Sequence, residues 1–434
     1  MLRKLGSFET AQALSNELFS FNAVVVIGLK NGPDTGLLKA ALVMLQKRHP
    51  LLQARIAKRG GSFYFQEGDG SEISVEEISM EHEQAWRDVV EKELDLPFRQ
   101  ADEPLMRVIL AKSAAGDEAD YLILTFHHAI LDAPSAGNIV RELLLFLSRK
   151  NPELFVDETV QPYPPLLPAE KYFPKEFRGM RLALKNFSYM NRQMWDEALF
   201  RWRSKGRRKA PIHESGHCKI LPLKIPRELS DALARHARKR RLTINSLFAA
   251  AMMKAVHKHL YNEEPRPIRH FSIANLRPYS DPPLPNDFLG GYFAMLRFTM
   301  QMDKQENVWE LARRVNDEVY RMAKRGDKFS ANVLGVHMMK ALFKFRAFRM
   351  GTTALSYTGA LDLEDQYGDI QVERIHAFVS NFPLGPEFTA QARLFKGEFY
   401  WDILYLDSDM NRQKAEAIAA ELDIILNAAI QNQE

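Results

Sequence analysis

Two adjacent histidines and an aspartate, His127, His128 and Asp132, stand in the stretch FHHAILDAPS. A neutral imidazole can take a proton from a hydroxyl or an amine near pH 7, so histidine is well matched to the role of general base. The residues YLILT before the pair are mostly apolar and predict a strand that is buried on both faces and ends at the histidines. Because side chains alternate along a strand, His127 and His128 should point to opposite faces.

Asp132 follows the histidines after a short turn. At this place a carboxylate could brace the turn by accepting backbone hydrogen bonds, or it could pair with an arginine. The HHxxxD pattern also arises by chance in roughly one or two of a hundred chains of this length, which is the risk attached to any short motif. The motif alone therefore suggests a proton-transfer site without establishing one.

Other chemical motifs are weaker. The stretch HESGHC, residues 213–218, fits neither a helical HExxH site nor a zinc-finger pair, so we expect a loop with incidental histidines and no metal. Cys218 is the single cysteine of the chain and cannot form an intramolecular disulfide. The sequence also lacks a P-loop, a GxGxxG segment after a strand and a GxSxG elbow, which disfavours nucleotide binding through such loops and a serine hydrolase.

The composition is that of a globular protein. Of the 434 residues, 46% are hydrophobic and 26% are charged, and the length suffices for two domains of ordinary size. The net charge of +4 is too small to indicate a nucleic-acid partner. No secretory signal or membrane span is visible, so we expect a cytoplasmic protein, with the inner face of the membrane as a possible peripheral location.

Two segments combine basic and apolar residues. In residues 171–209 lysines and arginines alternate with Phe, Trp, Met and Tyr. The favoured interpretation is a segment between domains that packs its aromatic side chains on the body and exposes its charges; attachment to an anionic membrane is the alternative. Residues 337–350 predict a core-facing helix with a solvated basic side, which could also line a lipophilic tunnel or touch a membrane.

Hydrophobic periodicity divides the chain into three parts with the boundaries 1–165, 166–215 and 216–434. Both outer parts mix helices and strands, and the proline-rich and basic-aromatic stretch between them is typical of a connector. The elements that this periodicity predicts are helices at 36–48, 81–94, 136–150, 228–240, 243–261 and 308–325, a C-terminal helix, strands at 62–66, 104–112, 121–128, 218–225 and 268–278, and a hairpin at 388–406 with its turn at Lys396 and Gly397.

Beyond the histidine motif, several stretches occur in an order that resembles one superfamily. These stretches are LLKAALVMLQKRHPLLQARI and ELDLPFRQADEPLMRVIL before the motif, and SIANLRPY, LGGYF and LSYTG after it. In this way the chain resembles the CoA-dependent acyltransferases, which include chloramphenicol acetyltransferase, condensation domains of peptide synthetases, and wax ester and alcohol acyltransferases, and whose signature is HHxxxDG. The resemblance implies a mixed α/β fold of two similar subdomains with a tunnel between them, in which the N-terminal part, 1–165, carries the motif.

The resemblance also implies roles for individual residues. His128 would be the general base, His127 would support it, and Asp132 would be a structural carboxylate that pairs with Arg277. Ser356 or Thr358 would donate a hydrogen bond to the oxyanion of a tetrahedral intermediate.

One departure from the signature concerns the residue after Asp132. The signature glycine is replaced by Ala133, which would be strained by about 1 kcal/mol if this position required a positive φ. The segment LEDQYGDI also differs from the DFGWG segment of the plant branch, which argues against membership of that branch.

The reaction implied by the resemblance is transfer of an acyl group from a thioester to a hydroxyl. Acyl-CoA would be the co-substrate, with the pantetheine arm of a carrier protein as another possible donor, and no cofactor would be permanently bound. We expect the acceptor to be an alcohol, plausibly a lipid, and the protein to be a monomer. The alternatives are a free-standing condensation domain that joins carrier-bound substrates and a non-catalytic relative that binds an acyl chain.

Overall fold

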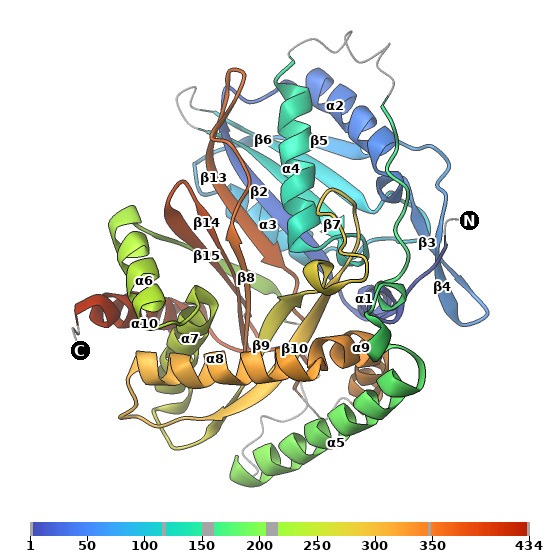
Figure 1. The fold of residues 1–434 in the computed structure, drawn as a ribbon. Coiled ribbons are helices and arrows are strands. Elements are labelled where there is room, and N and C mark those ends of the chain that lie inside the picture. Colours follow the sequence, from blue (N-terminus) through green and yellow to red (C-terminus); the bar gives the residue numbers. More distant parts are fainter. Residues whose placement is uncertain (1–2, 115–118, 150–159, 205–215, 346–348, 432–434) are drawn as a thin grey trace. The chain divides into compact units, whose positions relative to one another are not determined.

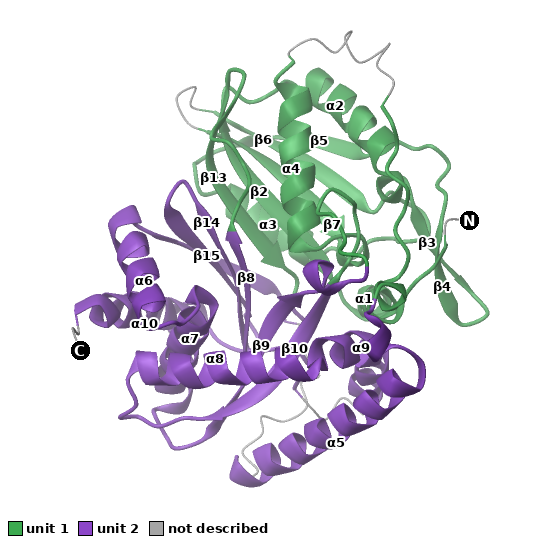
Figure 2. Ribbon diagram, in the orientation of Figure 1, with its two compact units in different colours: residues 1–172, 282–292, 360–380 green, residues 173–281, 293–359, 381–434 purple. Residues whose placement is uncertain are grey.

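The chain forms two units of mixed α and β structure in a computed structural model that describes residues 3–114, 119–149, 160–204, 216–345 and 349–431 (Figure 1). Unit 1 comprises residues 1–172, 282–292 and 360–380, and unit 2 comprises residues 173–281, 293–359 and 381–434 (Figure 2). Each unit is built on a six-stranded sheet with helices packed on it. The predicted mixed α/β fold of two similar halves is therefore confirmed.

Unit 1 contains two sheets and four helices among its described residues. Its strands and helices are β1 Arg3–Lys4, α1 Ser7–Leu18, β2 Asn22–Lys30, α2 Thr35–Arg48, β3 Arg55–Arg59, β4 Ser62–Gln66, β5 Ser74–Met80, α3 Trp86–Asp95, β6 Met106–Ser113, β7 Asp120–His127, α4 Ala133–Leu147, β12 Gln366–Tyr367 and β13 Ile370–Val379. Short 3-10 turns at Pro50–Leu52, His128–Ile130 and Ala169–Lys171 complete it.

The larger sheet of unit 1 has the strand order β12-β13-β2-β7-β6-β5, in which β7 is central. Strand β7 pairs antiparallel with β2 and with β6, and β5 pairs parallel with β6. Helices α2 and α4 pack side by side (Figure 1). From Tyr121 to His127 every side chain of β7 is buried, as its apolar run predicts, so the strand is a rigid support for the turn at its end.

Unit 1 is not continuous in sequence. Strand β13 pairs antiparallel with β2, so that Phe378 lies opposite Val24 although the two are far apart in the chain. The loop 282–292 also belongs to this unit. Contacts thus divide the chain differently from the continuous boundaries 1–165, 166–215 and 216–434, because a strand of the C-terminal part completes the N-terminal sheet.

Unit 2 contains one sheet and six helices among its described residues. Its elements are α5 Gly179–Arg203, β8 Cys218–Ile225, α6 Arg227–Lys239, α7 Ile244–Tyr261, β9 Pro267–Asn275, β10 Phe293–Gln301, α8 Val308–Arg325, α9 Asp327–Phe345, β11 Thr353–Ala360, β14 Phe388–Phe395, β15 Glu398–Leu406 and α10 Arg412–Gln431, with 3-10 turns at Lys175–Phe177 and Arg277–Tyr279. The strand order of the sheet is β10-β9-β11-β14-β15-β8.

One hydrophobic core joins this sheet to helices α6, α7, α8 and α10. Helix α7 is the most deeply buried of them, because every residue from Leu247 to Met253 is inaccessible to solvent. A helix that is apolar on all sides belongs in a core, and this one is capped by Thr243, whose hydroxyl accepts a hydrogen bond from the Ser246 N–H at 3.2 Å. The predicted cap is confirmed.

Most other predicted elements are confirmed as well. Strand β8 and helix α8 have the predicted limits, and the hairpin β14–β15 turns at Lys396 and Gly397, which both have a positive φ. Helix α9 turns Met339 and Leu342 inward and leaves Lys340 exposed, as predicted for its apolar and basic composition; residues 346–348 lie outside the described ranges.

Three expectations were wrong. Helix α3 begins at Trp86 rather than near residue 81, because residues before it form turns. Strand β7 ends at His127, and His128 already belongs to a 3-10 turn, so the alternation of a strand does not extend to it. In helix α5 the side chains of Phe187 and Trp195 are exposed instead of packing on the body.

No helix of the described residues is both long enough and apolar enough to cross a membrane.

Gly326 joins α8 to α9 with φ of +79°, and a Cβ on this residue would collide with the ring of Phe177. We expect Gly326→Ala to lower the free energy of unfolding by about 1–2 kcal/mol for the left-handed backbone and by about 1–3 kcal/mol more for the collision. Gly359→Ala is the matched control, since Gly359 has φ of +80° and no atom within 4 Å of its Cβ position. Urea unfolding measures both variants, and equal losses would contradict the collision.

Candidate active site

The two histidines lie at the point where the central strand of unit 1 ends. His127 is the last residue of β7, and His128 begins the 3-10 turn that leads to Asp132 at the start of α4. His127 is fully buried, whereas His128 is partly exposed. The structure thus gives the two imidazoles different surroundings within two residues.

The ring of His127 is held on both nitrogens. Its Nδ1 accepts a hydrogen bond from the Ala129 N–H at 3.1 Å, so the proton must reside on Nε2, which donates to Oε1 of Gln100 at 3.1 Å. Burial lowers the pKa of His127 to about 3, with smaller contributions from His128 and Arg107. A neutral imidazole with both nitrogens occupied is suited to support and not to proton transfer.

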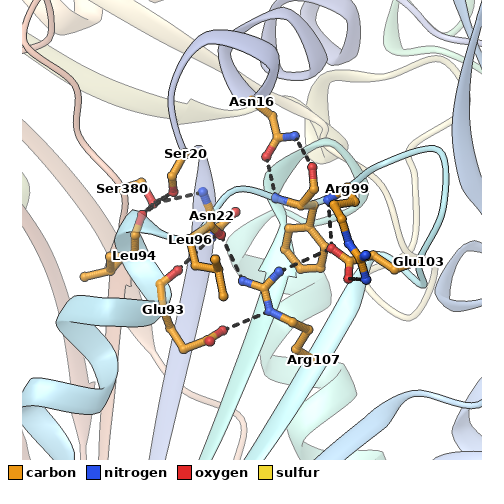
Figure 3. A network of polar contacts seen from close by, with 11 residues as sticks. Asn16, Ser20, Asn22, Glu93, Leu94, Leu96, Arg99, Glu103, Arg107 and Ser380 are labelled. Atoms are coloured by element: carbon orange, nitrogen blue, oxygen red, sulfur yellow. Dashed lines mark hydrogen bonds and ion pairs between the residues drawn. The ribbon is translucent and has the colours of Figure 1, made fainter. Parts of the chain in front are cut away.

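A polar network packs behind this ring. Asn22 of β2 lies opposite His127 in the sheet and donates to the carbonyls of Glu93 and Leu96 at 2.7 and 2.8 Å. Arg107 of β6 donates to the Glu93 carboxylate and the Leu96 carbonyl, and its guanidinium lies 4.1 Å from the ring centre of Phe98 (Figure 3).

The same network fixes the loop after α3 from two other sides. Asn16 of α1 exchanges hydrogen bonds with both backbone groups of Phe98, and Ser380 after β13 donates to the Leu94 carbonyl at 2.6 Å (Figure 3). The ring of Phe98 in turn meets His127 edge-on, with centroids 5.8 Å apart. Buried polar groups that find partners make a rigid wall, so the position of His127 is determined by several elements at once.

His128 has a different arrangement. Its backbone N–H donates to the Phe21 carbonyl at 3.3 Å, and its ring stacks on Phe21 with centroids 5.5 Å apart. Its Nδ1 lies 3.1 Å from the Leu131 carbonyl, which can only accept, so Nδ1 carries the proton and Nε2 carries the lone pair. Burial lowers the pKa of His128 below its usual value, opposed by the Leu131 hydrogen bond and the charge of Asp132. The ring is therefore neutral at pH 7, with Nε2 as its basic atom.

Asp132 holds the turn together with its two carboxylate oxygens. Oδ1 accepts from the N–H of Ser135 at 3.0 Å and from its hydroxyl at 2.8 Å, while the Ser135 hydroxyl also accepts from the Asp132 N–H, which is a capping box at the start of α4. Oδ2 accepts from the backbone N–H of Tyr292 at 3.1 Å. The predicted bracing by backbone hydrogen bonds is confirmed.

Ala133 is the first helical residue after this cap, and its φ is not positive. The strain that a positive φ would have imposed on alanine is absent at this position. Glycine is therefore not needed here for its backbone, and Pro134 follows in the first turn of the helix, where proline is well tolerated.

The other predicted site residues belong to unit 2. Arg277 is fully buried in the 3-10 turn after β9, and its ion pair with Asp132, which belongs to unit 1, stays a prediction. Ser356 and Thr358 of β11 are two residues apart and share one face of the sheet. The Thr358 hydroxyl donates to the Ala392 carbonyl at 3.4 Å.

Sequence reasoning missed the residues that position the histidines. Gln100, Phe98 and Arg107 lie in the stretch ELDLPFRQADEPLMRVIL, whose resemblance to the superfamily assigns no role to any of the three. Phe21 and Asn22 lie about a hundred residues before the motif, and no local pattern links them to it.

The described residues hold no group of three or more His, Cys, Asp or Glu side chains arranged to bind a metal. Of the stretch HESGHC, residues 213–215 lie outside the described ranges. Cys218 at its end begins β8 and is buried.

We expect Asp132→Ala to lower the free energy of unfolding by about 2–3 kcal/mol, because it removes a helix cap and leaves the Ser135 and Tyr292 N–H groups without their acceptor. Asp34→Ala is the control, since Asp34 caps the exposed start of α2 through the Leu37 N–H alone and should cost about 1 kcal/mol. Urea unfolding measures the difference, and equal losses would argue against the second role of Asp132.

The lowered pKa of His127 predicts a loss of stability in acid. The unfolded chain binds a proton on this ring near pH 6.5, but the folded chain does so only near pH 3, so the free energy of unfolding falls as the pH drops through this window. His127→Gln should remove this contribution and flatten the pH dependence, while buried His270, with a pKa of about 3, keeps its own share. A variant with the wild-type pH dependence between pH 4 and 6.5 would contradict the assignment.

Two family models match separate parts of the chain. Residues 10–164 match the family described as Condensation domain, and residues 218–336 match the C-terminal part of phthiocerol/phthiodiolone dimycocerosyl transferases. Cyclosporin synthetase of Tolypocladium inflatum is 33% identical over 120 residues, which are 26% of this chain and 1% of that much longer protein.

Solved structures agree on the fold. Polyketide synthase associated protein 5 from Mycobacterium tuberculosis superposes with a TM-score of 0.68 at 16% identity, covering 98% of both chains. Trichothecene 15-O-acetyltransferase from Fusarium sporotrichioides has a TM-score of 0.76 at 12% identity, covering 98% of this chain and 95% of its own. The two matched segments, 10–164 and 218–336, both resemble families of the CoA-dependent acyltransferases, in agreement with the resemblance seen in the sequence, and the chain shares the chloramphenicol acetyltransferase-like fold of these structures.

Proposed function

We propose that the protein transfers an acyl group from acyl-CoA to an alcohol, with His128 as the general base. Its family indicates acyltransferase activity, and the observation that carries the finer proposal is the geometry of His128. The Leu131 carbonyl fixes the proton on Nδ1, so the lone pair lies on Nε2 of a neutral ring whose pKa is lowered by burial. This is the protonation state that a base needs before the reaction.

The proposed reaction proceeds by addition and elimination. Nε2 of His128 takes the proton of the acceptor hydroxyl while its oxygen attacks the thioester carbonyl, and a tetrahedral oxyanion forms. When the intermediate collapses, the C–S bond breaks, the sulfur of CoA takes the proton from the imidazolium, and the ester is released. The histidine returns to its neutral form, and no acyl group is bound to the enzyme at any step.

Neighbouring groups tune this cycle. The carboxylate of Asp132 raises the pKa of His128 against the effect of burial, and it would favour the imidazolium of the intermediate. His127 stays neutral and adds no positive charge beside the base. We assign both to positioning roles, and we keep the Asp132–Arg277 ion pair as a part of this proposal.

For the oxyanion we favour Ser356 over Thr358. The Thr358 hydroxyl already donates to the Ala392 carbonyl of the neighbouring strand, whereas a donor to the intermediate must be available when the negative charge develops. Replacing Ser356 with Ala should reduce turnover more than replacing Thr358 with Val.

The proposed acceptor is an alcohol of lipid character, and the proposed donor is acyl-CoA. The many apolar side chains of α5 and α9 suit such an acceptor, and acyl-CoA suits the superfamily. The match of residues 10–164 to condensation domains favours a second candidate, in which carrier-bound substrates are joined. A non-catalytic relative that binds an acyl chain is the third.

Release of free thiol distinguishes these functions. A panel of acyl-CoA thioesters, from acetyl to palmitoyl, is incubated with short and long alcohols, and the same acyl groups are then offered on a carrier protein. Release that depends on both acyl-CoA and alcohol supports the proposal, and release from the carrier alone supports condensation. If neither donor reacts but acyl chains bind, the non-catalytic alternative holds.

We expect His128→Ala to lower kcat of acyl transfer by roughly 10²–10⁴-fold, the usual contribution of a general base. His82→Ala is the control, because His82 is exposed and distant in sequence from the motif. In the wild type the acidic limb of kcat/KM should lie below pH 6.5, since the pKa of His128 is lowered. A His128→Ala variant that folds and keeps its turnover would disprove the mechanism.

A further inference from the structure

An ordinary surface helix turns its apolar side chains towards the core, whereas helix α5, Gly179–Arg203, exposes its large apolar side chains to solvent. Six large hydrophobic side chains on it are 64–76% exposed. These residues are Met180, Leu184, Phe187, Met194, Trp195 and Trp202. They are six of the thirteen large hydrophobic side chains that are exposed among the described residues.

The exposed apolar residues lie in one stripe along the helix. Their spacing follows the helical repeat of 3.6 residues, which brings all six within an arc of about 100°. From Met180 to Trp202 the stripe is about 33 Å long at a rise of 1.5 Å per residue, and exposed Asn191 interrupts it between Phe187 and Met194. A large exposed apolar surface on a folded protein marks a site of interaction.

The inward face of α5 is polar and tightly held. The Gln193 amide exchanges hydrogen bonds with Arg297 of β10, at 2.7 Å to its Nε, and the buried Arg269 of β9 donates to Asp196 and Glu197 at 3.0 and 2.6 Å. The Arg269 guanidinium also lies 4.0 Å from the ring centre of Phe200.

One ion pair and one buried aromatic side chain add to this attachment. Arg192 pairs with Asp327 of α9 at 2.6 Å, and Tyr189 is 1% exposed. The helix thus lies beside α9 and the edge strand β10 (Figure 1). Its charged and amide groups fix it there, and its six large apolar side chains stay exposed.

The exposed charges around the stripe are mainly positive. Among the exposed charged residues from 171 to 203, Glu176 is the single acidic one, and the six others are Lys171, Lys175, Arg178, Arg181, Arg201 and Arg203. Arg181 and Arg201 lie on opposite borders of the stripe, because they are one residue away from Met180 and Trp202 on different sides. The two acidic residues of the helix itself, Asp196 and Glu197, are bound to Arg269, and Glu197 also pairs with Arg201 at 2.8 Å.

From this arrangement we propose that α5 docks unit 2 on an anionic lipid surface, with the helix axis parallel to the surface and the six apolar side chains inserted. A flat lipid surface can cover a straight stripe of this length, and tryptophan and arginine side chains are favoured at the interface between lipid and water. A second copy of the chain fits less well, because its α5 would bring further arginines against these and no exposed carboxylates to pair with them. This docking does not depend on the reaction at His128.

Flotation with vesicles tests the proposal directly. The full chain should float with vesicles of phosphatidylcholine and phosphatidylserine, bind vesicles of phosphatidylcholine alone at least tenfold less, and be released by high salt. The triple variant Met180→Ser, Leu184→Ser and Phe187→Ser should lose at least tenfold in binding. Tyr320→Ser on α8 is the matched control, since Tyr320 is 71% exposed in the same unit and should bind as the wild type does.

Tryptophan fluorescence gives an independent measurement. Trp195 and Trp202 are 68% and 75% exposed, whereas Trp86, Trp309 and Trp401 are 3%, 9% and 1% exposed. Lipids brominated in their acyl chains should therefore quench the emission of the first two, and the double variant Trp195→Phe and Trp202→Phe should float normally but lose the quenching. Thermal unfolding checks that each variant is folded.

Three results would overturn the proposal. The first is a wild type that does not bind vesicles containing phosphatidylserine. The second is a triple variant that binds them unchanged. The third is a stable dimer, seen by light scattering, that the triple variant converts to a monomer while vesicle binding is absent, because the stripe would then be an interface between copies.

Discussion

The candidate site depends on the carboxylate of Asp132, which links two segments of the chain by hydrogen bonds. One oxygen caps α4 through Ser135 and the other accepts from the Tyr292 backbone, so the loop 282–292 and the helix are fixed to the same residue. The turn between His127 and this cap includes Leu131, whose carbonyl determines the tautomer of His128. The helix cap therefore influences His128 through the backbone. A shift of Asp132 would move the adjacent Leu131 carbonyl, which keeps the proton of His128 on Nδ1.

Much of the fold follows from local patterns. Strand β8, the hairpin turn at Lys396 and Gly397, and the Thr243 cap of α7 are determined by periodicity, turn chemistry and capping within a few residues, and the sequence predicts them correctly. The pairing of β13 with β2 joins residues more than 340 positions apart. Neither strand is among the elements predicted from periodicity, and the residues of a strand carry no information about a partner so distant in the chain, so the discontinuous composition of unit 1 could not be predicted.

The site shows the same division. The histidines and Asp132 were recognisable from their types and spacing, but the distinct states of the two rings come from Gln100, Phe21 and the Leu131 carbonyl, which meet them only in the folded chain. The wrong interpretation of α5 has another cause. Aromatic residues occur on both faces of this helix. Asp196 and Glu197 bind Arg269 of β9, so the opposite face with Phe187 is exposed, and the helix sequence does not reveal this contact.

The buried surroundings of His127 affect His128, because they hold the neighbouring ring neutral. If His127 could take up a proton near pH 6, its charge would oppose a proton on the adjacent His128, and the proposed general base would weaken. Burial, with smaller contributions from His128 and Arg107, lowers the pKa of His127 to about 3. Hydrogen bonds from the Ala129 N–H and to Gln100 hold the neutral ring in one tautomer. The basicity of His128 is then set by burial against the Leu131 carbonyl and the Asp132 carboxylate, which are groups of its own turn and helix start. Because His127 stays neutral, a short local segment determines the basicity of His128, the proposed general base.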